Sequence, residues 1–264
     1  MLWREKRRGG NKVAGNLVEA CMKKMLTVTN LIRFLGVWTA VATVFLFTAA
    51  ALFMPPNARA VIFMATGVVL LWVLLGGLLM WRWREPIRAL VQRLPPPWPL
   101  TFVLFCTVLA LLEEAVTVTM TNLAPLFGVP LGAAYITASA NYLDVVLWHS
   151  VIVFVPMFIG WAILLRFWQV SPNGVFLVFG FTGFWLEAAF SGRLNLLQLG
   201  FWVFVYGLMV YLPAYCLPAR EGAKPPKAWH YAVMVLGPVL LAIPVALIIS
   251  TIHPTSIHFP PIVD

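Results

Sequence analysis

Long apolar runs, separated by short polar or proline-containing segments, dominate this chain. Seven of the runs are about 20 residues long, the length at which an α-helix crosses the hydrocarbon core of a bilayer. The pattern therefore predicts an all-α fold, a polytopic membrane helix bundle with about seven transmembrane helices. The predicted spans are Leu31–Met54, Ala60–Trp81, Leu100–Asn122, Tyr142–Trp168, Gly174–Phe190, Leu196–Leu217 and Tyr231–Ile252.

The segments between and within the spans carry local signals of their own. Pro156 predicts a kink inside the fourth span, because a proline removes a helical hydrogen bond. Arg82–Pro99, which contains three consecutive prolines, is predicted to be a connector. Leu123–Asn141 has no charged residue and is rich in Gly, Ala and Pro, so we expect it either to dip back into the bundle or to lie on its outer surface.

Composition supports a lipid-facing surface. Hydrophobic residues make up 62% of the chain, charged residues only 10%, and the mean hydropathy is +0.92. A soluble domain has about 25% charged residues. The three cysteines, Cys21, Cys106 and Cys216, are scattered and show no paired spacing, which argues against a disulfide framework or a cysteine metal site.

The net charge of +9 is distributed unevenly between the two ends of the spans. With the N-terminus in the cytoplasm, sixteen of the 18 Lys and Arg residues fall inside, and only Arg59 and Arg193 fall outside. The positive-inside rule therefore predicts an N-in, C-out topology. The expected partners of this charge are the lipid bilayer and its anionic headgroups rather than nucleic acid, and no protein partner is indicated.

This topology divides the chain into three parts. The membrane is expected to be a bacterial or archaeal plasma membrane. Residues 1–30 form a basic cytoplasmic segment, either an interfacial amphipathic helix or a disordered tail. Residues 31–252 form the transmembrane domain, and residues 253–264 form an external tail.

Two adjacent glutamates, Glu113 and Glu114, lie in the middle of the otherwise apolar third span. A carboxylate at membrane depth costs about 2.5–3.5 kcal/mol on insertion scales, which makes the pair a candidate functional site. On a helix, Glu114 shares a face with Thr117 and Thr121, whereas Glu113 is rotated from it by about 100°. We therefore expect Glu114 to point into the bundle. The alternative is that both carboxyls are protonated and only bridge helices.

The fourth span contributes Asp144 near its outer end and His149 further in. The two are five residues apart, which places them about 140° from each other on a regular helix, so they do not form a chelating pair. His149 is a candidate metal ligand or hydrogen-bonding partner. Asp144 suits the first turn of a helix, where an acid is favourable.

The fifth and sixth spans add a second set of polar candidates. Glu187 lies on a glycine-rich face that predicts close packing against another helix. Arg193, at the outer boundary, is expected to pair with Glu187 or with Asp144. Asn195 and Gln198 begin a polar and aromatic face in the sixth span. Together with the polar residues of the other spans, they are predicted to line a polar cavity, whose residues are Thr117, Thr121, Asp144, Arg193, Asn195 and Gln198.

The four main candidates fall at one depth. In the N-in topology, Glu113, Glu114, His149 and Glu187 all lie in the outer half of the bilayer. Three carboxyls and an imidazole suit a divalent metal or a proton relay. With zinc (Zn²⁺), His149 and Glu187 would be ligands, and Glu113 and Glu114 would be catalytic residues activating a water molecule.

The segment Leu111-Leu112-Glu113-Glu114-Ala115-Val116-Thr117-Val118 resembles the first motif of the glutamate-type intramembrane proteases, in both the CAAX-protease/bacteriocin-processing and the PrsW-like groups. Those families have a basic residue where this chain has Thr117 or Val118. Their second motif has Phe four residues before a His or Glu, whereas Gly183 precedes Glu187 at that distance. Their late His-Asn or His-Asp motif has no counterpart. The resemblance covers the third to fifth spans and implies a metal-dependent intramembrane hydrolase.

Two other function classes stay open on the sequence. Buried Glu and His residues, a glycine-rich fifth span and proline-containing fourth and seventh spans are also compatible with a proton- or ion-coupled transporter or channel. A non-catalytic subunit of a membrane complex would use the same acids as hydrogen bonds between helices.

Overall fold

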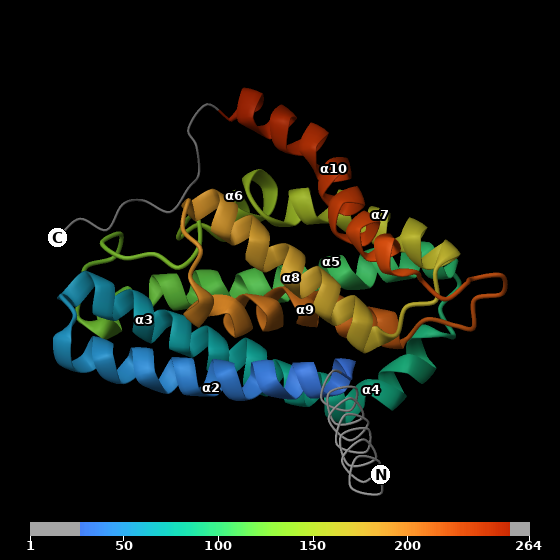
Figure 1. Ribbon diagram of the computed structural model, residues 1–264. Coiled ribbons are helices and arrows are strands. Elements are labelled where there is room, and N and C mark those ends of the chain that lie inside the picture. Colours follow the sequence, from blue (N-terminus) through green and yellow to red (C-terminus); the bar gives the residue numbers. More distant parts are fainter. Residues whose placement is uncertain (1–26, 254–264) are drawn as a thin grey trace, which may run out of the picture.

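The computed structural model describes residues 27–253, which form a bundle of antiparallel helices (Figure 1). The predicted N-terminal segment and external tail therefore lie almost entirely outside the described residues. Within the described range the regular structure is helical and no strand is formed. The elements are α2 (Val28–Phe53), α3 (Pro56–Val68), η1 (Val69–Gly76), α4 (Gly77–Val91), α5 (Trp98–Asn122), η2 (Ala124–Phe127), α6 (Tyr142–Trp148), α7 (Val151–Phe167), α8 (Pro172–Ser191), η3 (Leu196–Gln198), α9 (Leu199–Tyr215) and α10 (Ala228–Ile252).

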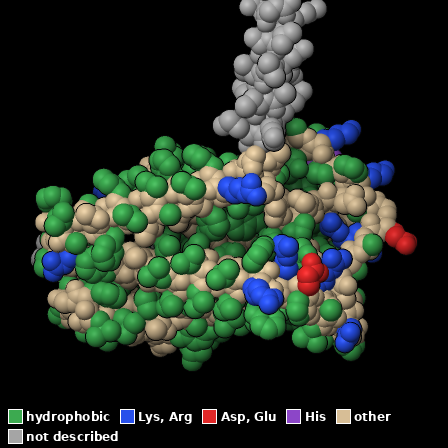
Figure 2. All heavy atoms as spheres, turned by 90° about the horizontal axis from the view of Figure 1, so that it is seen from below, with side chains coloured by type: hydrophobic (Ala, Val, Ile, Leu, Met, Phe, Trp, Pro, Cys, Tyr) green, Lys and Arg blue, Asp and Glu red, His purple; other side chains and the backbone are tan. Residues whose placement is uncertain are grey.

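Six helices in this part of the chain are long and apolar enough to cross a membrane, and the bent pair α6–α7 makes a seventh span if it is counted as one. This confirms the predicted polytopic bundle of about seven spans. Successive spans run in opposite directions, and on the face shown in Figure 2 most Lys and Arg side chains gather towards the end where α4 finishes. We call this the basic end. That it faces the cytoplasm stays a prediction.

The second span is longer than the apolar run predicts. α3, the π-helical η1 and α4 follow one another as a single 36-residue helix, Pro56–Val91, so most of the predicted connector Arg82–Pro99 is helical and only residues 92–97 connect. The extension is stabilised by contacts with the end of α9. Glu85 accepts a hydrogen bond from Tyr215, and Gln92 donates to the carbonyl oxygens of Cys216 and Leu217.

The fourth span bends at His149–Ser150 rather than at Pro156. α6 and α7 meet at 43°, whereas Pro156 lies inside the uninterrupted α7. The backbone of His149 leaves the helical region (φ −134°, ψ −76°), and both the Ser150 amide and its hydroxyl bind the carbonyl of Val145. A serine that competes for a main-chain carbonyl interrupts the regular ladder, which explains the break.

Helices α8 and α9 pack most closely, as the glycine-rich face of the fifth span predicts. A Cβ atom added at Gly180 would lie 2.4 Å from the carbonyl oxygen of Val203. One added at Gly183 would lie 2.1 Å from Cδ2 of Tyr206. Because small residues allow backbones to approach, this pair forms a rigid wall beside the central α5.

Candidate functional site

The adjacent glutamates lie on α5, which is covered by neighbouring helices along much of its length. Glu113 is 4% exposed and Glu114 is 6% exposed, so both side chains are enclosed by protein rather than by lipid. The residues around the pair on α5 are apolar or threonine. One stripe of α5, which carries Leu104, Val108 and Leu112, is about half exposed, whereas both glutamates lie on the covered part of its circumference.

Hydroxyl groups from three parts of the chain surround the Glu114 carboxylate. Thr117, one turn along α5, donates to Oε2 at 3.0 Å, and Thr137, from the loop after α5, donates to the same atom at 3.4 Å. The hydroxyl of Ser150, at the break between α6 and α7, lies near this carboxyl but donates to the carbonyl of Val145. Glu114 therefore links the third span to the following loop.

The loop 123–141 folds back into the bundle, which is one of the two arrangements expected from its charge-free sequence. Thr137 is 6% exposed, and Ala134 is fully covered. The amide of Ile136 donates to the Thr121 hydroxyl at 3.4 Å, and Asn122 donates to the carbonyl of Ala140 at 2.8 Å. The loop is thus held against the C-terminal end of α5 and covers Glu114.

Glu113 has a different environment from its neighbour. Within residues 27–253 no hydrogen bond reaches its carboxyl, which interacts electrostatically with the carboxyls of Glu114 and Glu187. Glu187, on α8, accepts a hydrogen bond from the hydroxyl of Tyr206 on α9. No Lys or Arg of the described range pairs with any of the three carboxyls.

The remaining predicted residues of the fourth span lie close to the loop. Asp144 is in the first turn of α6, which Asn141 caps, and it accepts a hydrogen bond from Ser139 at 3.3 Å. His149 is half-buried at the C-terminal end of α6. Between residues 27 and 253, no three His, Cys, Asp or Glu side chains are placed to hold a metal ion together. The proposed ligands His149 and Glu187 therefore do not form a metal-binding group with either Glu113 or Glu114 in this conformation.

Three of the predicted cavity residues lie at the surface. Arg193 is exposed, and its main chain rather than its guanidinium contacts the Ser191 hydroxyl. Asn195 is exposed and caps η3 by accepting from the amide of Leu197 at 3.1 Å. Gln198 is exposed and accepts from Trp202 at 3.4 Å. These side chains organise the turn between α8 and α9, away from the glutamates.

Sequence reasoning missed the hydroxyl groups that lie around Glu114. Thr137 and Ser150 are 23 and 36 residues from Glu114 in sequence, so no helical spacing connects them to it. The only available signal was the run of small polar residues between Ile136 and Tyr142 in a loop without charge. That run is equally typical of a turn in water.

The comparisons with known proteins give no relative from which a function can be transferred. No protein-family model, no curated protein and no solved structure matches this chain.

Proposed function

We propose that this chain is a multi-pass membrane protein that exchanges protons at the cluster of Glu113, Glu114 and Glu187, as a proton-coupled transporter or channel does. The observation that carries the proposal is a group of three electrostatically interacting carboxyls, two of them buried and Glu187 half-buried, without a basic partner in the described range. Several negative charges in a medium of low polarity repel each other strongly. The cluster therefore requires bound protons for its stability.

Glu113 is the best candidate for the exchanging group. Its neighbour Glu114 is held by hydroxyl donors, and Glu187 is held by Tyr206, whereas Glu113 has no hydrogen-bond donor among residues 27–253. A carboxyl on a side chain that is only 4% exposed is costly when no protein donor reaches it, so this position favours occupation by a proton or a water molecule.

Hydroxyl groups provide a route from this cluster towards the outer end of the bundle. Thr137 contacts Glu114 from the loop 123–141, and two residues along the same loop Ser139 contacts Asp144. Chains of acids and hydroxyls are a common form of proton relay in membrane proteins.

The test is proton flux in liposomes that contain the purified protein and carry an imposed pH gradient. We expect flux in the wild type and its loss in Glu113→Gln, which keeps the size of the side chain but cannot ionise. Glu221→Gln is the matched control, because Glu221 is exposed in the loop before α10. Equal flux in wild type and Glu113→Gln, or none in the wild type, would reject proton coupling.

The zinc-dependent intramembrane hydrolase is the second candidate. The observation that favours it is the adjacency of two buried glutamates in one helix, one anchored and one without a donor in the described range. An unanchored carboxylate beside an anchored one suits a general base that takes a proton from water. Metal analysis of purified protein tests it: stoichiometric zinc that is lost in Glu114→Gln supports this mechanism, and wild type without metal removes it.

A further inference from the structure

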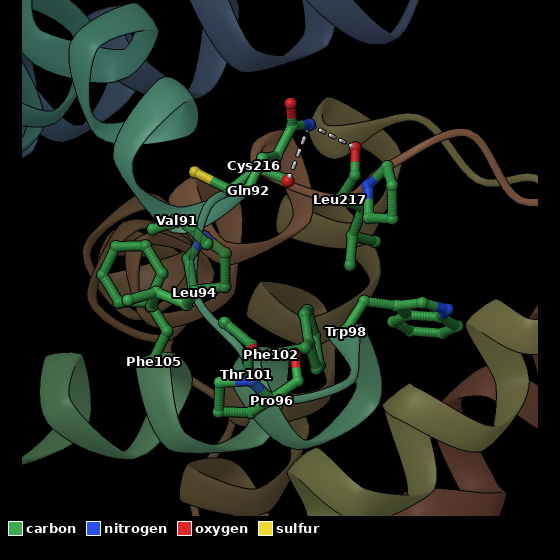
Figure 3. Close-up of a pocket in the computed structure, with 12 residues that line it drawn as sticks. Val91, Gln92, Leu94, Pro96, Trp98, Thr101, Phe102, Phe105, Cys216 and Leu217 are labelled. Carbon is green, nitrogen blue, oxygen red and sulfur yellow. Dashed lines mark hydrogen bonds between the residues drawn. The ribbon is translucent and has the colours of Figure 1, made fainter.

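A pocket of about 370 Å³ lies at the basic end of the bundle, far along α5 from the glutamates. Its walls come from the end of α4, the beginning of α5 and the end of α9, and they are mostly apolar. Figure 3 shows Leu94 and Phe105 on one side, Trp98 on the opposite side, Phe102 between them and Leu217 above. The volume is at the lower end of the range of about 300–1,000 Å³ found for ligand pockets.

The main polar side chain in the wall of the pocket is Gln92, whose amide nitrogen already has hydrogen-bond acceptors in the protein. The Gln92 amide donates to the carbonyl oxygens of Cys216 and Leu217 at 3.2 and 3.4 Å (Figure 3). It therefore joins α4 to the end of α9 and fixes the shape of the pocket. The space that remains suits an apolar group, since polar ligands need donors and acceptors directed into the cavity.

Two arginines precede the pocket residue Gln92 on α4, by about one and two helical turns, without lining the pocket. Arg84 and Arg88 stack on the ring of Tyr215 at 5.2 and 5.7 Å from its centroid. Arg88 precedes Gln92 by one helical turn and interacts electrostatically with Cys216, another pocket residue. The one acid here, Glu85, is bound by the Tyr215 hydroxyl, so two arginines and one glutamate leave the group positive.

An apolar pocket beside a positive rim matches an amphiphile with an anionic head. We propose that the pocket holds one acyl chain of an anionic phospholipid, whose phosphate lies against Arg88 and Arg84. The volume suits one chain rather than a whole lipid. The site lies at the end of the spans, where headgroups are found, and guanidinium groups bind phosphate well. The proposal is independent of the glutamate cluster.

Native mass spectrometry of the protein released from bilayers of phosphatidylglycerol and phosphatidylcholine tests this site. We expect one retained phosphatidylglycerol per chain. Leu94→Trp fills the pocket from a residue that is 47% exposed, and it should abolish retention. Leu90→Trp, on α4 and 63% exposed but outside the pocket, is the matched control and should retain the lipid.

The charge contribution is tested by titration with phosphatidylglycerol. Arg88→Gln should weaken binding by about fivefold, the effect of about one basic residue near a membrane surface. Arg82→Gln, whose guanidinium stacks on Trp83 instead, should leave binding unchanged. Equal retention of phosphatidylcholine, equal binding by Arg88→Gln, or equal stabilisation by inorganic phosphate alone would overturn the proposal. If Leu94→Trp does not fold, the comparison of lipid binding by Arg88→Gln and Arg82→Gln tests the proposal instead.

Discussion

Replacement of Gly183 by alanine tests how packing between α8 and α9 supports the glutamate cluster. The added Cβ would lie 2.1 Å from Cδ2 and 2.3 Å from Cγ of Tyr206, whereas unstrained carbon atoms stay about 3.5–4.0 Å apart. Because Cγ is close to the backbone of α9, the ring cannot avoid the contact by a small rotation. Either the two helices separate or Tyr206 leaves its position, and with it the hydrogen bond to Glu187.

The magnitude follows from three contributions. Overpacking costs about 1–3 kcal/mol, and the lost hydrogen bond adds about 1 kcal/mol. Alanine recovers about 1 kcal/mol through its higher helix propensity. We therefore expect Gly183→Ala to lower the free energy of unfolding by about 1–3 kcal/mol. Gly36→Ala is the control, because its Cβ would meet only Cζ of Phe204 at 3.6 Å, and we expect it to be neutral or slightly stabilising.

The assay follows thermal unfolding in detergent with a fluorogenic thiol dye. Cys106 and Cys216 are buried and become reactive when the bundle opens, and a Cys21→Ser background limits the signal to them. A midpoint that falls by roughly 2–4 °C per kcal/mol is expected for a chain of this size. Tyr206→Ala removes the ring, so Gly183→Ala should cost little in that background. The same cost in both backgrounds would refute the steric explanation.

Three further predictions concern the loop, the end of α7 and the buried thiol. Thr137→Val removes a donor to the α5 carboxyl and should speed hydrogen exchange in residues 129–141 by up to about tenfold, with Thr119→Val as control because that hydroxyl binds only its own helix. Arg220→Ala removes a donor from three main-chain carbonyls at and after the end of α7 and should cost about 1–3 kcal/mol in the thiol-dye assay, whereas the exposed Arg166→Ala should cost little. Burial raises the pKa of the Cys216 thiol to about 12, so its alkylation at pH 8 should be roughly 1,000-fold slower than that of a free cysteine.

The raised pKa of Cys216 also determines whether the stability of the protein rises or falls with pH. The unfolded thiol ionises near 9.0, whereas the folded thiol keeps its proton up to about 12. Stability contributed by this residue should therefore fall as the pH rises above 9, and Cys216→Ala should lack this component. Fast alkylation at pH 8 would contradict the burial of the thiol. Unchanged exchange in Thr137→Val, or an equal cost for both arginine variants, would contradict the other two contacts.

The number of spans and the location of the acids follow from local properties of the chain. An apolar run of sufficient length crosses a bilayer whatever its neighbours are, because the cost of leaving polar groups in hydrocarbon acts on each segment separately. Glu113 and Glu114 are recognisable as functional candidates for the same reason. The extension of the second helix through Arg82–Val91 was missed because the contacts that stabilise it come from α9, more than 120 residues later in the sequence.

By itself, the sequence determined that this protein is a bundle of about seven apolar helices with carboxyls inside it. Only the tertiary structure decided what those carboxyls meet: Thr137 from a folded-back loop, and Tyr206 from a helix brought close by glycine. Hydrogen bonds act over about 3 Å, and such distances are set by packing between distant segments. The pattern of spans indicates the depth of a carboxyl in the membrane and the side of the helix on which it lies. It does not specify which donor lies within hydrogen-bonding distance of that carboxyl.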